Sequence, residues 1–228
     1  MFNNSKYGNL LTIILVVAIV AIIGIVCIIG YRIYKAYYVD TGATEAATQF
    51  EQSLQNNISG QQNIVSDNNI KTDITGIEDS ILSNQNNNTS SQTTTKYKGF
   101  TVVGIIQIPK IKLKYPILEK LSTTSLKTSV VLMYTAQGLN NEGNSVIIGH
   151  NYRNGTMFSN VDKLANGDFI YITDTTGRKM KYKIYNIYRA SGSESEYITR
   201  NTNGKREISL STCTDDSKAR TIVLAREV

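Results

Sequence analysis

An unbroken apolar run near the N-terminus constrains this chain more than any other feature of its sequence. Residues 10–30 read LLTIILVVAIVAIIGIVCIIG, which is 21 residues without a charge. As a helix the run would be about 30 Å long, enough to cross the hydrocarbon core of a bilayer, and it is longer than the apolar core of about 7–15 residues in a signal peptide. Four tyrosines, Arg32 and Lys35 follow directly, as in the aromatic and basic belt of a membrane interface. We expect a retained single-span membrane anchor after a short tail at residues 1–9.

The segment after the anchor is polar. We expect residues 40–55 to continue as a short polar helix, and 25 of the 40 residues from 56 to 95 are Asn, Gln, Ser or Thr. Such a stretch buries too little apolar surface to offset the entropy lost on ordering, although a little helix is expected near residues 74–82. Residues 31–95 are therefore predicted to form a juxtamembrane helix and a flexible linker that holds a folded domain off the membrane.

The composition narrows the classes of function. The chain has two cysteines and one histidine, which exclude a disulfide-stapled scaffold, a zinc site of four thiolates and a His-pair metal motif. Neither a metal nor a cofactor is expected. Residues 96–228 carry a net charge of +9, which suits an anionic envelope polymer or an ordinary solvated surface. No aromatic-basic RNA motif or zinc finger is present, so no nucleic-acid partner is expected.

From about residue 96 the pattern changes to short β-rich runs separated by turn signals. Asn-Gly or Thr-Gly pairs stand at 166–167, 176–177 and 203–204, and they supply the positive φ that tight turns need. Eight short strands in some 130 residues predict an all-β barrel or sandwich. The expected strands are 100–108, 111–118, 128–133, 145–149, 168–174, 179–189, 206–212 and 220–226, with weak helix signals at 123–127 and 157–164.

Cys213 and His150 are the only thiol and imidazole available to this β-rich domain, because Cys27 lies inside the apolar run. Each is expected where a strand ends and a loop begins, which is where nucleophiles usually lie. A thiol needs a base or an imidazolium neighbour to react at neutral pH. Taken singly, each residue could instead be structural.

Arg220 begins the last apolar run, seven residues after Cys213. If the two residues lie on neighbouring antiparallel strands, their side chains meet across a short hairpin. A guanidinium there could donate hydrogen bonds to a developing oxyanion, because it does not deprotonate. The alternative is a solvated charge on a strand.

Three separated motifs resemble those of the sortase family. GHN followed by GTMF contains His150, SLSTC ends at Cys213, and Arg220 precedes the terminal apolar strand. GIIQIP from residue 104 and YPIL from residue 115 resemble the first strands of the family's catalytic domain. The resemblance covers residues 97–228 and implies an eight-stranded sortase-type β-barrel with short helices.

The resemblance also implies an activity. Sortases are thiol transpeptidases that cleave a sorting signal of the Leu-Pro-any-Thr-Gly type after its Thr. The thioacyl group then passes to an amine, from a peptidoglycan precursor or a pilin lysine. By this likeness Cys213 is the nucleophile, His150 the general acid/base and Arg220 the clamp for substrate and oxyanion. The family context places the catalytic domain, residues 96–228, on the extracellular side of the cell membrane.

The residues next to these motifs bear on substrate and class. Asn151, Ser211, Thr212 and Asp215 are candidate substrate-binding residues. The segment GHNYRNGTMF and Asp215 resemble class B, whereas the short stretch before the Cys motif leaves little room for the helix of that class. Ser209 stands where the family usually has Thr. The class, B or D-like, stays open.

Two other functions remain open from the sequence. The same Cys and His could belong to another cell-wall thiol peptidase. A tethered β-domain could instead bind an envelope polymer through its positive charge without catalysis. Residues 188–200, rich in Ser and Glu, are expected either as a loop over a peptide groove or as an exposed connection.

Overall fold

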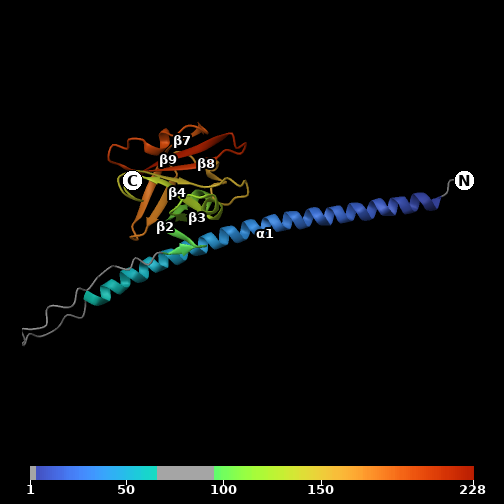
Figure 1. Ribbon diagram of the computed structural model, residues 1–228, viewed down its shortest axis with the longest axis horizontal. Helices are drawn as coiled ribbons and strands as arrows, with labels where there is room; N and C mark the ends of the chain where they lie inside the picture. The colour runs from blue at the N-terminus through green and yellow to red at the C-terminus, as the bar shows by residue number, and fades with distance from the viewer. Residues whose placement is uncertain (1–3, 66–94) are drawn as a thin grey trace, which may run out of the picture.

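The β-rich part of the chain closes into a barrel (Figure 1). The computed structural model describes residues 4–65 and 95–228. Neighbouring strands hydrogen-bond in the order β1-β2-β3-β4-β5-β8-β9-β7-β6, and β6 pairs again with β2 to close a ring of eight. The strands are β1 (Lys96–Tyr97), β2 (Phe100–Ile108), β3 (Leu113–Leu118), β4 (Val130–Thr135), β5 (Gly143–Ile148), β6 (Phe169–Asp174), β7 (Lys179–Ser191), β8 (Arg206–Cys213) and β9 (Ala219–Glu227).

The predicted all-β barrel is confirmed. Each of the eight expected strands lies within a few residues of its predicted position, and the two-residue strand β1 is additional. Alternating residues point inward and fill the barrel with β-branched and aliphatic side chains, among them the fully buried Ile106, Ile117, Ile147, Ile170 and Leu210. Two pairs of neighbours are parallel, β3 with β4 and β5 with β8.

The helices outside the barrel differ greatly in length. The helices are α1 (Asn4–Val65), α2 (Thr123–Thr128) and α3 (Glu196–Thr199), with 3₁₀ turns η1 (Pro109–Ile111) and η2 (Val161–Lys163). The expected helix at 123–127 is therefore α2, which begins with a capping box formed by Ser122 and Ser125. The signal at 157–164 corresponds to η2 only.

The predicted membrane anchor lies within α1. Over Leu11–Tyr34 this helix is long and apolar enough to cross a membrane, and none of that stretch is buried inside the protein. Figure 1 shows α1 extending far beyond the barrel toward the N-terminus.

The structure differs from the sequence expectation in the segment that follows the apolar span. The helix does not stop near residue 55 but continues to Val65, and part of it packs on the barrel. Ala43, Ala47 and Phe50 are buried and belong to the barrel's main core. Their spacing of four and three residues places them on one face of the helix. The remainder of the expected linker, residues 66–94, and the helix expected at 74–82 lie outside the described residues.

Polar contacts reinforce this helix–barrel interface at β3. The Lys114 ammonium lies 2.8 Å from a carboxylate oxygen of Glu51 and also donates to the hydroxyl of Thr48. The Thr44 hydroxyl donates to the Lys114 carbonyl at 3.5 Å. The part of the helix after the apolar span is thus a structural element of the barrel and not only a tether.

Replacing Phe50 by Ala tests this docking. A buried Phe→Ala change costs about 3–5 kcal/mol, so the docked segment should open at least about a hundredfold more often. Amide hydrogen exchange of residues 43–54 in the full chain should accelerate accordingly. The matched control is Gln52→Ala, at an exposed position on the same helix. Equal exchange rates in both variants would contradict the docking.

Candidate active site

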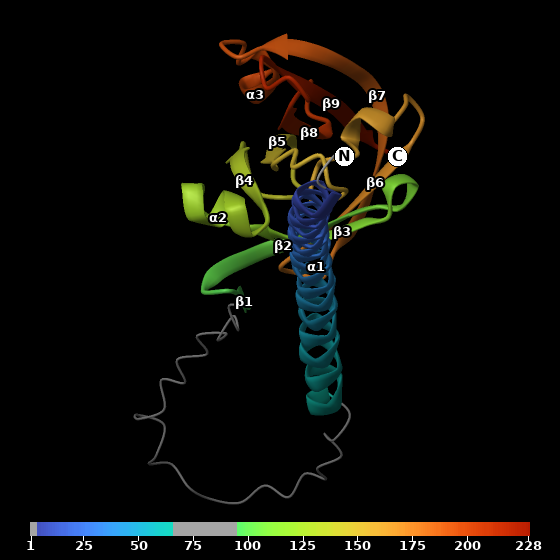
Figure 2. The ribbon, with the colours of Figure 1, turned by 90° about the vertical axis from the view of Figure 1, so that its right-hand side faces the viewer.

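The register of three neighbouring strands brings Cys213, His150 and Arg220 to one end of the barrel. In the parallel pair of β5 and β8, Ile148 lies opposite Ser211. His150 and Cys213 each follow two residues later, so the two chains leave the sheet side by side. In the antiparallel pair of β8 and β9, Cys213 lies opposite Arg220. The predicted pairing of Cys213 with Arg220 across the hairpin is confirmed, and Figure 2 shows β5, β8 and β9 together.

Hydrogen bonds continue this alignment beyond the end of β5. The Gly149 N–H donates to the Ser211 carbonyl at 3.3 Å, and the Thr212 hydroxyl donates to the Gly149 carbonyl at 2.8 Å. A Cβ on Gly149 would lie 2.8 Å from the ring of Phe158, so only glycine fits immediately before His150. The backbone on both sides of the candidate pair is thereby fixed.

The three candidate residues are partly exposed, whereas the strand that leads to Cys213 is buried. His150, Cys213 and Arg220 have intermediate exposure, and every residue from Glu207 to Thr212 is buried. A thiol, an imidazole and a guanidinium lie at one accessible rim. Together they can supply a nucleophile, a proton acceptor and a hydrogen-bond donor to an oxyanion. This combination suits acyl transfer.

Asn151 connects the two loops that carry His150 and Cys213. Its side-chain N–H group donates to the Cys213 carbonyl at 3.1 Å and to a carboxylate oxygen of Asp215 at 2.8 Å. Its side-chain oxygen accepts from the Arg153 N–H at 3.0 Å. Two of the four residues expected to bind substrate thus bond to each other and position the site.

The other two residues expected to bind substrate are buried. Ser211 and Thr212 are 1% and 3% exposed. The Ser211 hydroxyl donates to the Tyr197 hydroxyl at 3.4 Å, and Thr212 bonds to Gly149 as described. In this structure both hydroxyls are buried and bond within the protein, so both residues support the strand ends.

The surroundings of His150 favour its neutral form. Partial burial lowers the pKa of the His150 imidazole below its ordinary value of 6.5, and the positive charge of Lys127 on α2 lowers it further. The ring of Tyr152 packs beside it at 4.9 Å between centroids. Burial raises the pKa of the Tyr152 phenol. At neutral pH His150 is therefore ready to accept a proton.

The segment 188–200 is neither a loop nor a simple exposed connection. Its first residues continue β7 to Ser191, and α3 then covers the outer face of β5 and β8. Tyr197 of α3 is buried in a second hydrophobic cluster, together with Val146, Ala190, Ile222 and Leu224. The Asn144 side chain holds α3 by donating to the carbonyls of Tyr197 and Ile198, both at 2.8 Å.

A buried carboxylate anchors the end of α3, and sequence reasoning missed it. Glu207 of β8 is 2% exposed and accepts hydrogen bonds from Arg200, from Arg226 at 2.6 Å and from the Tyr185 hydroxyl at 2.9 Å. A buried charge needs such partners to offset its desolvation. These partners come from separate elements, so no local pattern indicates the network.

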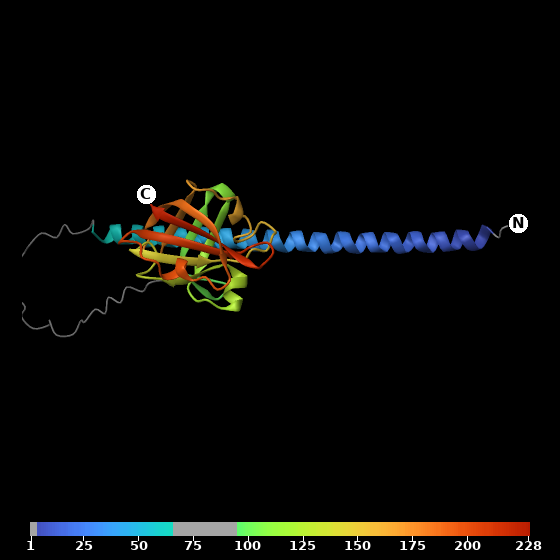
Figure 3. The same cartoon turned by 90° about the horizontal axis from the view of Figure 1, so that it is seen from above.

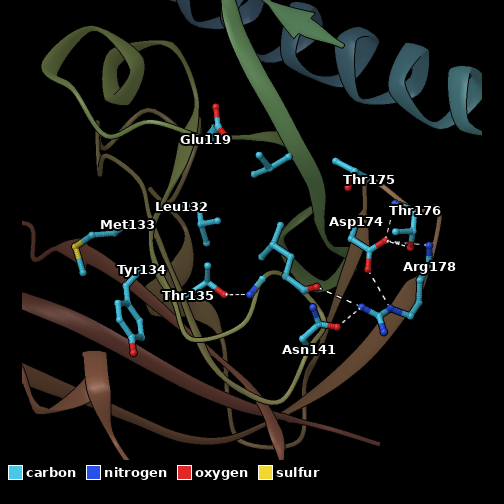
Figure 4. Close-up of a pocket in the computed structure, with 13 residues that line it drawn as sticks. Glu119, Leu132, Met133, Tyr134, Thr135, Asn141, Asp174, Thr175, Thr176 and Arg178 are labelled. Atoms are coloured by element: carbon cyan, nitrogen blue, oxygen red, sulfur yellow. Dashed lines mark hydrogen bonds and ion pairs between the residues drawn. The ribbon is translucent and has the colours of Figure 1, made fainter. Parts of the chain in front are cut away.

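A separate cavity of about 500 Å³ opens elsewhere on the barrel (Figure 4). It is lined by β4 residues, the β4–β5 loop and the β6–β7 turn, where Arg178 bonds to Asp174 and Asn141. None of the three candidate catalytic residues lines it. Within residues 4–65 and 95–228, no group of three or more His, Cys, Asp and Glu side chains could hold a metal ion.

Comparison with known proteins assigns the barrel to a family. The family described as "Sortase domain" matches residues 106–228, which is more than half of the chain. The chain belongs to the sortase family. The resemblance seen in the motifs around His150 and Cys213 is thereby confirmed at the level of the family.

Individual relatives agree with this assignment. Over 121 residues the chain is 30% identical to Sortase A of Bacillus anthracis, covering 51% of this chain and 56% of that protein. A Clostridium perfringens Sortase D5 transpeptidase is similar in structure, with a TM-score of 0.51 and 30% identity over 56% of this chain and 79% of the other. A lid mutant of Sortase A from Corynebacterium diphtheriae is also similar in structure, with a TM-score of 0.51 and 29% identity. The similarity covers 56% of this chain and 70% of the other. The chain spans 56% of the length of the two curated Sortase A relatives that it matches in sequence.

The titration of His150 can be observed directly, because it is the only histidine of the chain. We expect its imidazole resonances to report a pKa below 6.5, and Lys127→Gln to raise that pKa by removing a nearby positive charge. Protein stability should fall as the pH drops below about 6.5, because the unfolded state binds the proton more tightly. Lys181→Gln on β7 is the control. A pKa at or above 6.5, unchanged by Lys127→Gln, would contradict this environment.

Asn151→Ala tests the link between the two loops. Loss of three side-chain hydrogen bonds, one of them to a carboxylate, should lower the free energy of unfolding by about 1–3 kcal/mol in urea titrations. The exposed Asn166→Ala should have an effect within about 0.5 kcal/mol. If the two variants are equally stable, Asn151 does not hold the loops together.

Proposed function

We propose that this chain is a membrane-anchored cysteine transpeptidase that joins a sorting-signal peptide to an amine. One observation carries the proposal: within a sortase-family barrel, Cys213 lies opposite Arg220, and His150 leaves the neighbouring strand beside it. The chemistry needs a nucleophile, a base and a hydrogen-bond donor to the oxyanion, and these three side chains supply them.

The first half-reaction acylates the enzyme. His150 accepts the proton of the Cys213 thiol, and the sulfur attacks the carbonyl carbon of Thr in a Leu-Pro-any-Thr-Gly-like signal. As the carbon–sulfur bond forms, the Arg220 guanidinium donates hydrogen bonds to the oxygen that becomes negative. The carbon–nitrogen bond to Gly then breaks, and His150 returns its proton to the leaving amine.

The second half-reaction releases the product. An amine from a peptidoglycan precursor or a pilin lysine attacks the thioacyl carbon and loses a proton to His150. The new amide bond forms as the carbon–sulfur bond breaks, and the proton returns to Cys213. Atoms and charge balance without a redox partner or a cofactor.

The proposal also assigns the parts of the chain. Residues 1–9 are a short tail, residues 10–30 the anchor, residues 31–95 the connection, and residues 96–228 the catalytic domain. The catalytic domain lies on the extracellular side of the cell membrane, where surface proteins and wall precursors are available. The sortase class, B or D-like, follows from the signal that the enzyme accepts.

Mass spectrometry of the full chain in detergent, with peptides of several sorting-signal classes and an amine, tests this function. We expect an acyl adduct on Cys213, cleavage after Thr and a peptide–amine product. Cys213→Ala and His150→Ala should lower turnover by at least about a thousandfold, whereas the thiol variant Cys27→Ala should retain it. Free acid alone, despite abundant amine, would favour the thiol-peptidase alternative. A Cys213→Ala protein that keeps all function would favour the binding domain.

Arg220→Lys tests the oxyanion role separately. A flexible ammonium does not replace the planar fork of a guanidinium, so kcat/KM should fall about a hundredfold or more. Arg178→Lys, beside the cavity of Figure 4, is the matched control and should stay near the wild-type rate. Wild-type kinetics in Arg220→Lys would remove Arg220 from the mechanism.

A further inference from the structure

The end of the barrel that carries the candidate site faces the apolar half of α1. Strand β9 starts at Ala219 beside that site and runs toward the C-terminus. In Figures 1 and 3 the C-terminus lies on the side of the barrel away from the N-terminus of α1. The start of β9 and the ends of β5 and β8 therefore point toward the N-terminal half of the helix.

The distance from this end to a membrane is short. The apolar span ends at Tyr34, and Ala43, nine residues later, is already buried against the barrel. At 1.5 Å per residue this interval is about 14 Å. The headgroup layer on each side of a bilayer occupies about 5–8 Å of it. Because the docked helix is continuous with the span, it holds the barrel close to the membrane surface.

Basic and aromatic side chains cluster on the same end. Lys127 and Tyr152 flank His150, and the Arg153 guanidinium donates to the Ser217 hydroxyl at 3.4 Å, next to Lys218. We call Lys127, Tyr152, Arg153 and Lys218 the basic edge. All four of these side chains are exposed, and Tyr152 is 43% exposed, a high value for an aromatic residue of the barrel.

Two acidic residues lie in the turn beside the basic edge. Asp215 bonds to Asn151, while Asp216 accepts from the Thr214 hydroxyl at 2.5 Å and from the Lys218 N–H at 3.1 Å. These contacts lower the pKa of Asp216, so it is charged. Lys127, Arg153, Lys218 and Arg220 outnumber the two carboxylates, so the basic edge and its turn together are net positive.

We infer that the basic edge rests on the anionic phospholipid headgroups of the membrane that holds α1. Basic side chains near a membrane are attracted to anionic lipids, and tyrosine prefers the interfacial layer. The candidate site then opens onto the headgroup layer, and it meets peptides and acceptors that are held at that surface. This inference rests on the proposed anchoring of α1.

A tryptophan reporter tests the contact, because the chain contains no Trp. Tyr152→Trp in the full chain is reconstituted into vesicles of phosphatidylcholine with phosphatidylglycerol, containing a lipid with a nitroxide on its headgroup. Its emission should shift to shorter wavelength and lose about half its intensity, and high salt should reverse much of this. The control Val228→Trp, at an exposed position just after the far end of β9, should lose little. Vesicles of phosphatidylcholine alone should quench Tyr152→Trp weakly.

Charge reversal separates lipid contact from mere proximity. Adding Arg153→Glu and Lys218→Glu to Tyr152→Trp should abolish the extra quenching in anionic vesicles, whereas Lys179→Glu with Lys181→Glu on β7 should not. Hydrogen exchange of residues 149–157 in the unmodified chain should also be slower in anionic than in neutral vesicles. Equal quenching of both Trp reporters, or equal exchange in both lipids, would overturn the inference. The inference would also be overturned if protection from hydrogen exchange depended on the density of protein in the vesicles and not on lipid charge. Such a result would indicate contact with a second copy of the chain.

The outcome is independent of the activity assay. If lipid-dependent quenching is observed in a protein that does not cleave peptides in detergent, the lipid contact of the basic edge is supported and the proposed function is contradicted. If the protein cleaves peptides in detergent but shows no lipid-dependent quenching, only the inferred lipid contact of the basic edge is overturned. A chain that does not float with the vesicles would overturn the anchoring and this inference together.

Discussion

The pairing of β5, β8 and β9 is the constraint on which the candidate site depends. Side chains alternate along β8, so Ile208 and Leu210 fill the barrel while Ser209, Ser211 and Cys213 point outward. A slip of one residue would move each of these sets to the other face. The core therefore enforces the register, and the register places Cys213 opposite Arg220 and beside His150.

The outer face of these strands carries a second constraint. Ser209 points out of the barrel but is fully buried, because α3 covers it. Buried polar groups need partners, and Asn144, Arg200 and Glu207 form a connected set there in which the Arg200 Nε alone has no partner among the described residues. This network fixes α3 and with it Tyr197, whose hydroxyl reaches the Ser211 side chain two residues before Cys213. The strand that ends at Cys213 is thus held from both faces.

The sequence predicts the strands, and it singles out Cys213, His150 and Arg220 as candidates, because these signals are local. Alternating apolar residues and Gly-containing turns mark the strands, and the scarcity of thiol and imidazole leaves few candidates. The influence of Lys127 on His150 and the partners of Glu207 depend on tertiary packing, which no spacing indicates. The docking of α1 has a local signal of its own, a helical stripe within a polar segment formed by Ala43, Ala47, Phe50 and Leu54.

The apolar span and the barrel are joined through buried side chains of α1, so the candidate site has a defined orientation relative to that span. That orientation directs the loops after β5 and β8 toward the N-terminal half of α1, while the cavity of Figure 4 is separate from the candidate residues.

The most direct test of the central claim is a crystal structure of the barrel with its docked segment of α1 and a sorting-signal peptide trapped on Cys213. The account predicts a bond from the Cys213 sulfur to the Thr carbonyl carbon, and the Arg220 guanidinium within about 3 Å of the carbonyl oxygen. It also predicts the His150 ring on the side of the departed amine. A peptide bound in the cavity near Asp174, or a carbonyl oxygen turned away from Arg220, would contradict it.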